Sequence, residues 1–544
     1  MTVGPAALLA RFGAPDACAA RLLCADHPPG DLAFTVVEPD LTSRDLSFGE
    51  LERESASFAA ALADLDIGPG DRVGVLMSRS IELVVTLLGI WRRGAVLVPL
   101  STALGRPGIA LRLRSAGARL VVVDADRRTK LAAGEGVPAD PRWRVVVVRG
   151  EPGRRELSFE ALMALYVDDP GPAPVVVGGD GLLAHVFTAG TTGPPKAIPV
   201  PVRALAAFAV ARAASADRPG DVCWDTADPG WPTGLYSALL GPLATGRRGL
   251  LTRGALAPAP AWRLLDRFRV THLHAGPAHF RAMAAAGPPP SGLALRHASS
   301  TGEPLPPDLV TWAAEALGVA LHDRYGQAEL GTVLVDPSAD GTDGGCPPGT
   351  LGRPLPGWTV AVLGDDGVEP APPGTVGRLA VARSSPLMWF SGYLGDAGAT
   401  PSAPGPSAPG PFTPDGRWYL TGDTAGVDGA GCHRFSARTG DVIVTAGHRI
   451  APFEVESVLM LHDDVVEAVV VGMPARNGAV PEAYVVLRAG AEAAFGLGEE
   501  LKRMVRAKLT PQAVPRVVHV VDVLPRTPGG SVRRAALRER RANW

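Results

Sequence analysis

This 544-residue chain has few lysines, a small net charge and no long apolar runs. Only four of its 53 basic residues are lysines, namely Lys130, Lys196, Lys502 and Lys508. The net charge is −2 and the basic residues are scattered, which argues against nucleic acid or an anionic membrane surface as a partner. No run approaches the roughly 20 apolar residues of a membrane-spanning helix, and we expect neither a membrane span nor a targeting signal.

Cysteine is also sparse. The chain has five cysteines at widely spaced positions, and none forms a CxxC pair: Cys18, Cys24, Cys223, Cys346 and Cys432. An odd number with this spacing argues against a disulfide framework and against a zinc site. We therefore expect reduced cysteines and a cytoplasmic protein.

The remaining composition fits a large folded chain. With 46% hydrophobic and 20% charged residues, the sequence can build a large core and more than one domain. In the first half, β-branched runs at 72–76 and 120–124 alternate with helical patterns such as 81–93, which predicts parallel sheets covered by helices. Residues 400–414 are rich in Pro, Gly, Ser and Ala and are expected to form an exposed loop. After Arg438 the pattern changes to short strands interleaved with helices.

The segment 188–196 reads TAGTTGPPK and has the chemistry of a phosphate-binding loop. Glycines let the backbone approach a ligand, while threonine hydroxyls and one ammonium group donate to phosphate oxygens. The spacing differs from the GxxxxGK[ST] pattern of P-loop NTPases, so the way that class holds the β- and γ-phosphates is not expected here. Keeping a lysine here, in a chain so poor in lysine, supports a chemical role. The candidate nucleotide ligands are Thr188, Gly190, Thr191, Thr192, Gly193 and Lys196.

Further motifs follow in the order and spacing of one superfamily. They read STGEPLP (300–306), DRYGQAE (323–329), YLTGD (419–423) and FSARTGDVIVTAGHRIAPFEVES (435–457). With them the chain resembles the adenylate-forming ANL superfamily, in the branch of acetyl- and medium-chain acyl-CoA synthetases. The resemblance runs from about Phe48 to Arg534. It implies an α/β fold with two parts: an AMP-binding domain of parallel and mixed sheets covered by helices (1–438), and a small mobile α+β lid (439–544).

The resemblance also implies two half-reactions in one pocket. ATP and a carboxylic acid give an acyl-adenylate and pyrophosphate with the help of Mg²⁺, and the thiol of coenzyme A then displaces AMP as the lid rotates. Asp423 would accept both ribose hydroxyls, because a carboxylate offers two acceptors to a vicinal diol. Tyr325 would stack on the adenine. The other implied adenine-site residues are Gly302, Glu303, Pro304, Asp323, Arg324 and Gln327.

The lid side of the site is implied in the same way. Glu329 would be the Mg²⁺ carboxylate, and Lys196, Glu329 and Arg449 would be catalytic. Arg438 and Arg449 would contact the ribose and phosphates, and Gly440 falls at the hinge. Gly447 and His448 would lie beside the pantetheine of coenzyme A, where a side chain at the glycine would block entry.

The acid pocket is suggested by WDTADPGWPTG (224–234), which resembles the acyl-binding stretch of the same branch. Trp231, Thr233 and Thr301 would line it. Acetyl-specific members carry a tryptophan where this chain has Gly326, and a glycine would leave the tunnel open. We therefore expect a bulky apolar acid.

One departure from the family pattern bears on the reaction. The C-terminal motif LPRTPGGSVRR (524–534) has Ser531 where the family has a lysine that bridges the substrate carboxylate and the α-phosphate during adenylation. Losing one such stabiliser typically costs ~10²–10³ in rate. Ala189, Ala328 and Gly440 also depart from the pattern, and each touches phosphate handling or lid rotation.

Three hypotheses follow. The first is a non-adenylating acyl-CoA ligase that performs only thioesterification, with acyl-AMP supplied by a separate adenylating enzyme, in a dedicated biosynthetic pathway. The second is a complete ATP-dependent acyl-CoA synthetase in which Arg533 replaces the missing lysine or its loss is tolerated. The third is a non-catalytic partner protein that binds adenylates, which the intact coenzyme A channel argues against.

Overall fold

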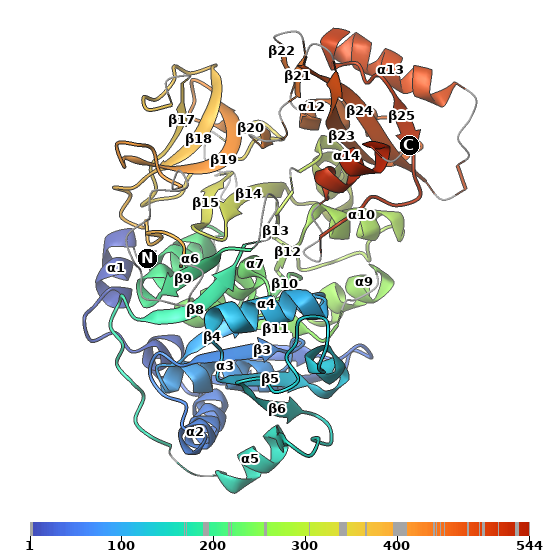
Figure 1. Ribbon diagram of the computed structural model, residues 1–544. Coiled ribbons are helices and arrows are strands. Elements are labelled where there is room, and N and C mark those ends of the chain that lie inside the picture. Colours follow the sequence, from blue (N-terminus) through green and yellow to red (C-terminus); the bar gives the residue numbers. More distant parts are fainter. Residues whose placement is uncertain are drawn as a thin grey trace.

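The computed structural model describes residues 4–542, and the ranges that it leaves out are the following: 168, 170, 189–194, 216–217, 219, 255–257, 304, 337–344, 365–366, 395–410, 439–440, 442, 446–447, 451, 476–477, 489, 492–495, 510 and 528–531. The expected loop at 400–414 therefore lies mostly outside the described residues. Figure 1 shows the chain from the N-terminal helix α1 (Pro5–Phe12) to the C-terminal helix α14 (Arg534–Ala542).

A seven-stranded sheet forms the N-terminal part of the structure. Its strand order is β7-β6-β5-β3-β4-β8-β9, and every pair is parallel except β8 with β9. Alternate strand residues pack on α4 on one face and on α2 and α3 on the other, as the sequence alternation predicted. The elements are α2 (Phe48–Asp64), β3 (Arg72–Leu76), α3 (Ile81–Arg92), β4 (Val96–Pro99), α4 (Arg106–Ala116), β5 (Leu120–Asp124), β6 (Arg144–Val148), β7 (Glu156–Ser158), α5 (Phe159–Leu165), β8 (Leu182–Phe187) and β9 (Ala197–Pro201).

A nine-stranded sheet follows, with the order β16-β15-β14-β13-β12-β10-β11-β1-β2. One face of its parallel centre packs its apolar residues against α9, α10 and α11, while the opposite face points toward α6. The elements are β1 (Leu32–Val37), β2 (Ser43–Ser47), α6 (Leu205–Ala213), β10 (Cys223–Asp225), α7 (Pro232–Gly234), α8 (Gly241–Thr245), β11 (Gly249–Thr252), α9 (Pro258–Arg267), β12 (His272–His274), α10 (Pro277–Ala285), β13 (His297–Thr301), α11 (Pro307–Trp312), β14 (Leu321–Gln327), β15 (Gly331–Val335) and β16 (Arg353–Pro354).

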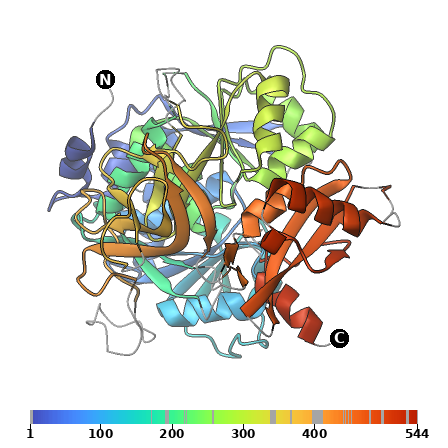
Figure 2. The same cartoon turned by 90° about the horizontal axis from the view of Figure 1, so that it is seen from above.

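Two smaller sheets complete the fold. The first is antiparallel, in the order β17-β18-β19-β20, and it aligns Asp423 with Arg438. The second belongs to the C-terminal segment, which Figures 1 and 2 show beside the rest of the chain. The elements are β17 (Val360–Leu363), β18 (Val376–Ala382), β19 (Trp418–Val427), β20 (His433–Arg438), β21 (Ile443–Thr445), β22 (His448–Ile450), α12 (Pro452–Leu459), β23 (Val465–Ala475), β24 (Gly478–Leu487), α13 (Leu497–Lys508) and β25 (Val518–Val520).

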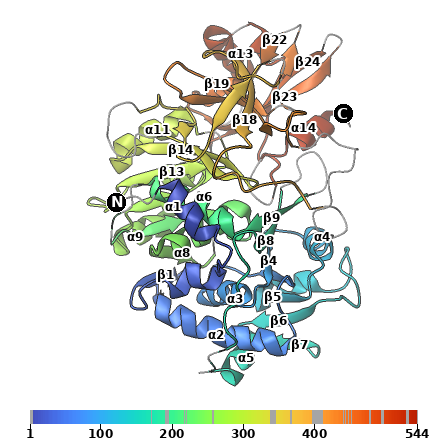
Figure 3. The same ribbon diagram turned by 90° about the vertical axis from the view of Figure 1, so that its left-hand side faces the viewer.

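The C-terminal segment has hydrophobic clusters of its own, in which α12 and α13 pack on β23 and β24. Figure 3 shows it at the end of the molecule opposite α2 and α5. The predicted fold class is therefore confirmed: a large α/β part with mixed sheets and a smaller α+β part. None of the helices among the described residues is long and apolar enough to cross a membrane.

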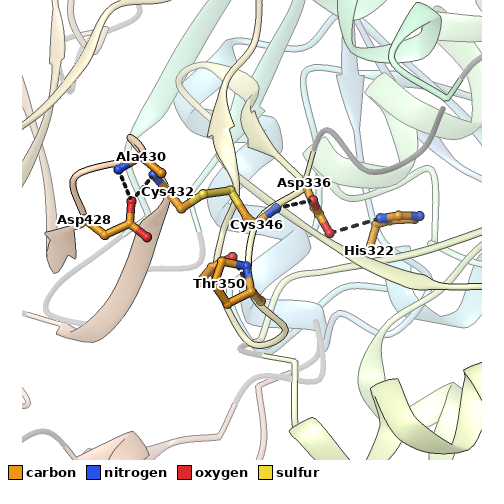
Figure 4. Close-up of a disulfide and its surroundings, with 8 residues drawn as sticks. His322, Asp336, Cys346, Thr350, Asp428, Ala430 and Cys432 are labelled. Atoms are coloured by element: carbon orange, nitrogen blue, oxygen red, sulfur yellow. Dashed lines mark hydrogen bonds and ion pairs between the residues drawn. A yellow bond between two sulfur atoms is a disulfide. The ribbon is translucent and has the colours of Figure 1, made fainter. Parts of the chain in front are cut away.

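The expectation that all cysteines are reduced is wrong in this structure. Cys346 and Cys432 form a disulfide, and its sequence separation is 86 residues (Figure 4). Spacing along the sequence could not indicate this pair, because the two cysteines come together only in the folded chain. There, backbone hydrogen bonds of Leu351 and Gly352 with His433 hold the two segments side by side. The bond also removes cysteine spacing as an argument for a reducing compartment.

Candidate active site

The two ends of the phosphate loop are held together in the structure. The amide of Thr188 donates to the carbonyl of Lys196 at 3.0 Å, and the amide of Lys196 donates to the Thr188 hydroxyl at 3.0 Å. Gly190, Thr191, Thr192 and Gly193 lie outside the described residues. The predicted loop is therefore closed at its base by hydrogen bonds between its first and last residues.

Lys196 and Glu329 converge on one tyrosine. The Lys196 ammonium lies 4.8 Å from the centroid of the Tyr393 ring, and the Tyr393 hydroxyl donates to Oε1 of Glu329 at 2.7 Å. Burial, followed by the charge of Glu329, raises the pKa of Tyr393, so this hydroxyl stays a donor. The structure thus brings a cation and a carboxylate from distant segments to one place.

Asp423 lies at the centre of a hydrogen-bonded cluster. Its Oδ2 accepts from the Tyr325 hydroxyl at 2.6 Å and from the Gln327 amide at 3.0 Å. Gln327 also donates to the Thr421 carbonyl at 2.8 Å and accepts from the Tyr419 hydroxyl at 2.9 Å. Two motifs nearly 100 residues apart, DRYGQAE and YLTGD, therefore form one site with a buried carboxylate.

Asp323 is buried on β14, two residues before Tyr325. Burial raises its pKa to about 7, although the Leu305 amide, 3.4 Å from Oδ2, acts in the opposite direction. A carboxyl with this pKa changes its charge near neutral pH.

The C-terminal motif reaches the same place. Arg526 bridges Oε1 of Glu303 at 3.1 Å and Oε2 of Glu467 at 2.9 Å, and so joins the C-terminal segment to the STGEP motif. The Arg533 amide donates to the Pro525 carbonyl at 2.7 Å, and Arg526 pairs with Val532 across a short antiparallel bridge. Ser531, which precedes Val532 in the sequence, lies outside the described residues.

One cavity of about 1630 Å³ contains the described parts of all these motifs. Its lining includes Lys196, Asp423, Arg526 and Arg533, and also the predicted acid-pocket residues Trp231, Thr233 and Thr301. Arg112 lies over the Trp231 ring at 6.0 Å. The structure therefore connects the nucleotide motifs and the acid motif through a single space, which is large enough for several small molecules.

Gly326 is required by local packing. A Cβ at this position would overlap the Gly331 carbonyl group of β15, because the pairing of β14 with β15 shifts register between Tyr325 and Gly326. The sequence analysis explained this glycine only as a residue that leaves the acid tunnel open. In this structure, the close approach of β15 excludes a side chain there regardless of substrate.

Arg324 points away from its sequence neighbours. Successive strand residues face opposite sides, and its guanidinium donates to the Ser215 hydroxyl while Tyr325 faces Asp423. Its backbone carbonyl accepts from the Thr301 hydroxyl at 2.7 Å. Its side chain thus reaches the segment between α6 and β10, although the sequence analysis grouped it with the adenine-site residues.

The remaining predicted positions are described only in part. Pro304, Gly440 and Gly447 lie outside the described residues, while Arg438 ends β20 and His448 and Arg449 lie in β22. The sequence reasoning missed Tyr393, Tyr419 and Arg526. Tyr419 opens the YLTGD motif and Arg526 lies in the C-terminal motif, so both could have been found there, whereas Tyr393 lies in no motif.

Comparisons with known proteins agree with this geometry. Residues 24–394 match the model of the AMP-binding enzyme family, and residues 454–530 match that of the AMP-binding enzyme C-terminal domain. An acetyl-coenzyme A synthetase of Bacillus subtilis is 30% identical over 506 residues, which cover 90% of this chain and 84% of that protein. An uncharacterised acyl-CoA ligase of the same organism is 30% identical over 504 residues, covering 91% and 90%.

Solved structures show the same likeness. An acyl-CoA synthetase of Brucella canis has a TM-score of 0.74 at 36% identity and covers 99% of this chain and 98% of its own. A benzoate CoA ligase of Burkholderia xenovorans has a TM-score of 0.81 at 25% identity and covers 96% and 99%. The chain belongs to the AMP-binding enzyme family, and it is an acyl-CoA ligase within the ANL superfamily. Enzymes of this family use a carboxylic acid, ATP and coenzyme A, generally with Mg²⁺.

Proposed function

We propose that this protein makes the coenzyme A thioester of an acid larger than acetate, and that it starts from an acyl-adenylate formed by another enzyme. The observation that carries the proposal is the serine at 531. Thr527 and Val532, which flank the undescribed stretch around it, both line the large cavity. A hydroxyl there cannot offset the charge of a carboxylate and a phosphate that are brought together.

The retained residues suit the second half-reaction. Asp423, with Tyr325 and Gln327 on its Oδ2, would hold the ribose of an acyl-adenylate. Lys196 would contact the phosphate group, with Arg438 and Arg449 on the side of the C-terminal segment. Gly447 and His448 would border the path of coenzyme A. Thioester formation from an acyl-adenylate does not require these groups to bring two free anions together.

The described residues fit Mg²⁺ only in a limited way. They contain no group of three or more His, Cys, Asp or Glu side chains that could hold a metal. Glu329 is one buried carboxylate, and Tyr393 already occupies its Oε1. One carboxylate suits a magnesium ion that takes most of its other ligands from phosphates and water, which is how ATP would bring it during adenylation.

A complete ATP-dependent synthetase is the second candidate. Arg533 favours it, because this arginine lies two residues from Ser531 and lines the same cavity. Its guanidinium would then replace the missing lysine. A non-catalytic partner protein is not favoured, since the relatives are ligases over nearly the whole chain.

We further propose that the protein works in the cytoplasm, where ATP and coenzyme A are made. The Cys346–Cys432 disulfide weighs against this location, because disulfides rarely persist there.

The test is to supply acid plus ATP, and in parallel the prepared acyl-adenylate, and to follow the coenzyme A thioester by mass spectrometry. Thioester from the adenylate alone supports the proposal, and Ser531→Lys should then raise turnover from acid plus ATP by about 10²–10³-fold. Arg533→Ala is the matched variant, since it should abolish the acid reaction only if Arg533 replaces the lysine. Turnover of acid plus ATP by wild type at ordinary rates, about 1–10³ per second, would overturn the split reaction.

A further inference from the structure

One face of the nine-stranded sheet is unusually polar. Along β10, β12 and β13 the register aligns Cys223, His272 and His297 in one row, and Asp225, His274 and Ser299 in the next. The interior strands of a parallel sheet normally carry apolar residues on both faces. Here the opposite face does so, with Trp224, Leu273 and Ala298. The polar rows therefore require a separate explanation.

These rows line the inner end of the large cavity. Asp225, His274, His297 and Ser299 all belong to its lining, as do Arg212 and Arg324 at the edges of the face. Nδ1 of His274 lies 2.9 Å from the Ser299 hydroxyl. Burial lowers the pKa of His274, and the charges of Asp225, Arg324 and Arg212 act on it as well, so these side chains gather around one imidazole. A neutral imidazole offers one donor and one acceptor.

Two atoms of this cluster have no hydrogen-bond partner. Oδ1 of Asp225 accepts from the Ala227 amide at 2.8 Å, but Oδ2 is buried without a partner, and the whole residue is only 7% exposed. Nε2 of His297 is likewise buried and unpartnered in a residue that is 6% exposed. A buried polar atom without a hydrogen-bond partner destabilises the folded state unless a bound group supplies that partner. Both residues belong to the lining of the large cavity, so a ligand bound there would lie next to them.

The position of the cluster fits the far end of an acid. Ser299, in the row of Asp225 and His274, pairs with His322 on β14, and Gly326 lies four residues further along that strand. With a rise of about 3.3 Å per residue, this row lies roughly 13 Å from the Gly326 level. An acid whose carboxyl group reacts near Gly326 would bring its other end to Asp225 and His274.

We propose that this inner cluster selects an acid that carries a hydroxyl group at its far end, an inference that rests on the proposed acyl-CoA ligase function. A hydroxyl can donate to Oδ2 of Asp225 and at the same time accept from an imidazole or guanidinium N–H. A second carboxylate would be placed beside the Asp225 carboxylate, and a methyl group would leave Oδ2 unpaired. The substrate is then apolar along its body and polar at its end.

The test measures binding, so that it does not depend on turnover. Acyl-adenylate analogues with a sulfamate in place of the phosphate would be titrated by calorimetry. They carry straight chains of about eight to twelve carbons, which span the roughly 13 Å between the two levels, and end in methyl, hydroxyl or carboxylate. We expect the hydroxyl compound of the best length to bind wild type about 10–100-fold more tightly than its methyl counterpart, as for a hydrogen bond to a buried charge.

Variants then locate the preference. Asp225→Leu should remove the hydroxyl preference and favour the methyl compound. Asp228→Asn is the matched control: it lines the same cavity, but its oxygens already accept from Ser101 and Gly230, so the hydroxyl-to-methyl ratio should be unchanged. Circular dichroism checks that each variant is folded. The comparison of the three end groups on the wild-type protein tests the inference even if a variant does not fold.

Three results would overturn the inference: equal or tighter binding of the methyl compound, tightest binding of the carboxylate compound, or a hydroxyl preference that survives Asp225→Leu. Failure of the ligase proposal looks different. In that case the hydroxyl analogue binds with the expected selectivity, yet neither acid plus ATP nor the matching acyl-adenylate yields a thioester.

Discussion

The Tyr325 hydroxyl donates to Oδ2 of Asp423 at 2.6 Å and so joins β14 of the nine-stranded sheet to β19 of the antiparallel sheet. Gln327 donates to the same oxygen. The carboxylate is thereby fixed by two side chains from one strand. The ribose-binding role that we propose for Asp423 therefore depends on contact between two separate sheets.

Asp423→Asn tests that role. The change keeps the size of the side chain but removes its charge, and charge-assisted hydrogen bonds contribute about 1.5–3 kcal/mol each. We expect affinity for AMP and acyl-adenylate analogues to fall about 10–100-fold by calorimetry. Asp415→Asn is the control, because that exposed aspartate pairs with Thr413 and Arg417 outside the cavity. Equal losses in both variants would refute the assignment.

Gly326→Ala tests the packing explanation of this glycine. The added Cβ would overlap the Gly331 carbonyl, and overpacking of this kind costs about 1–3 kcal/mol. We expect a lower unfolding temperature, measured by differential scanning calorimetry. Gly276→Ala is the control, since its φ is −71° and its Cβ would meet only the Thr301 carbonyl oxygen at 3.9 Å. If Gly326→Ala melts at the wild-type temperature, tunnel width becomes the better explanation.

The Cys346–Cys432 bond predicts sensitivity to reduction. It closes a long loop between residues separated by 86 positions, and a native disulfide typically contributes about 2–4 kcal/mol. Dithiothreitol should therefore lower the unfolding temperature of wild type. The double variant Cys346→Ser, Cys432→Ser should melt at the lower temperature with or without the reductant. A free-thiol titration that counts five reactive thiols in unfolded, unreduced wild type would contradict the bond.

Arg526→Ala tests how the C-terminal segment is held. The guanidinium joins Glu303 to Glu467, and all three side chains are about one quarter exposed, so solvent screening limits the stabilisation to about 1 kcal/mol or less. We expect a small increase in the radius of gyration by X-ray scattering and faster proteolysis between the two parts. Arg417→Ala, which breaks an exposed pair with Glu369 far from this contact, should change neither. An unchanged scattering curve for Arg526→Ala would show that other contacts hold the segment.

The sequence predicted several elements closely because their signals are local. The runs at 72–76 and 120–124 became β3 and β5 with the same bounds, and the pattern at 81–93 became α3 with an end one residue earlier. Alternation of β-branched residues and helical periodicity depend only on neighbours along the chain. The motifs that carry Lys196, Asp423 and Glu329 were also visible, because their residue types follow from the chemistry of phosphates, diols and metals.

The tertiary structure decided the features that depend on neighbours far along the chain. Three such features join segments that no sequence periodicity relates. They are the Cys346–Cys432 bond, the contact of Tyr393 with Lys196 and Glu329, and the polar face around Asp225 and His274. Likewise, Gly326 was identified from sequence, but the Gly331 carbonyl that excludes a side chain there comes from a register shift in β14 and β15. The sequence alone determines which side chains can take part in the chemistry, whereas strand register and burial arise only when the sheets assemble.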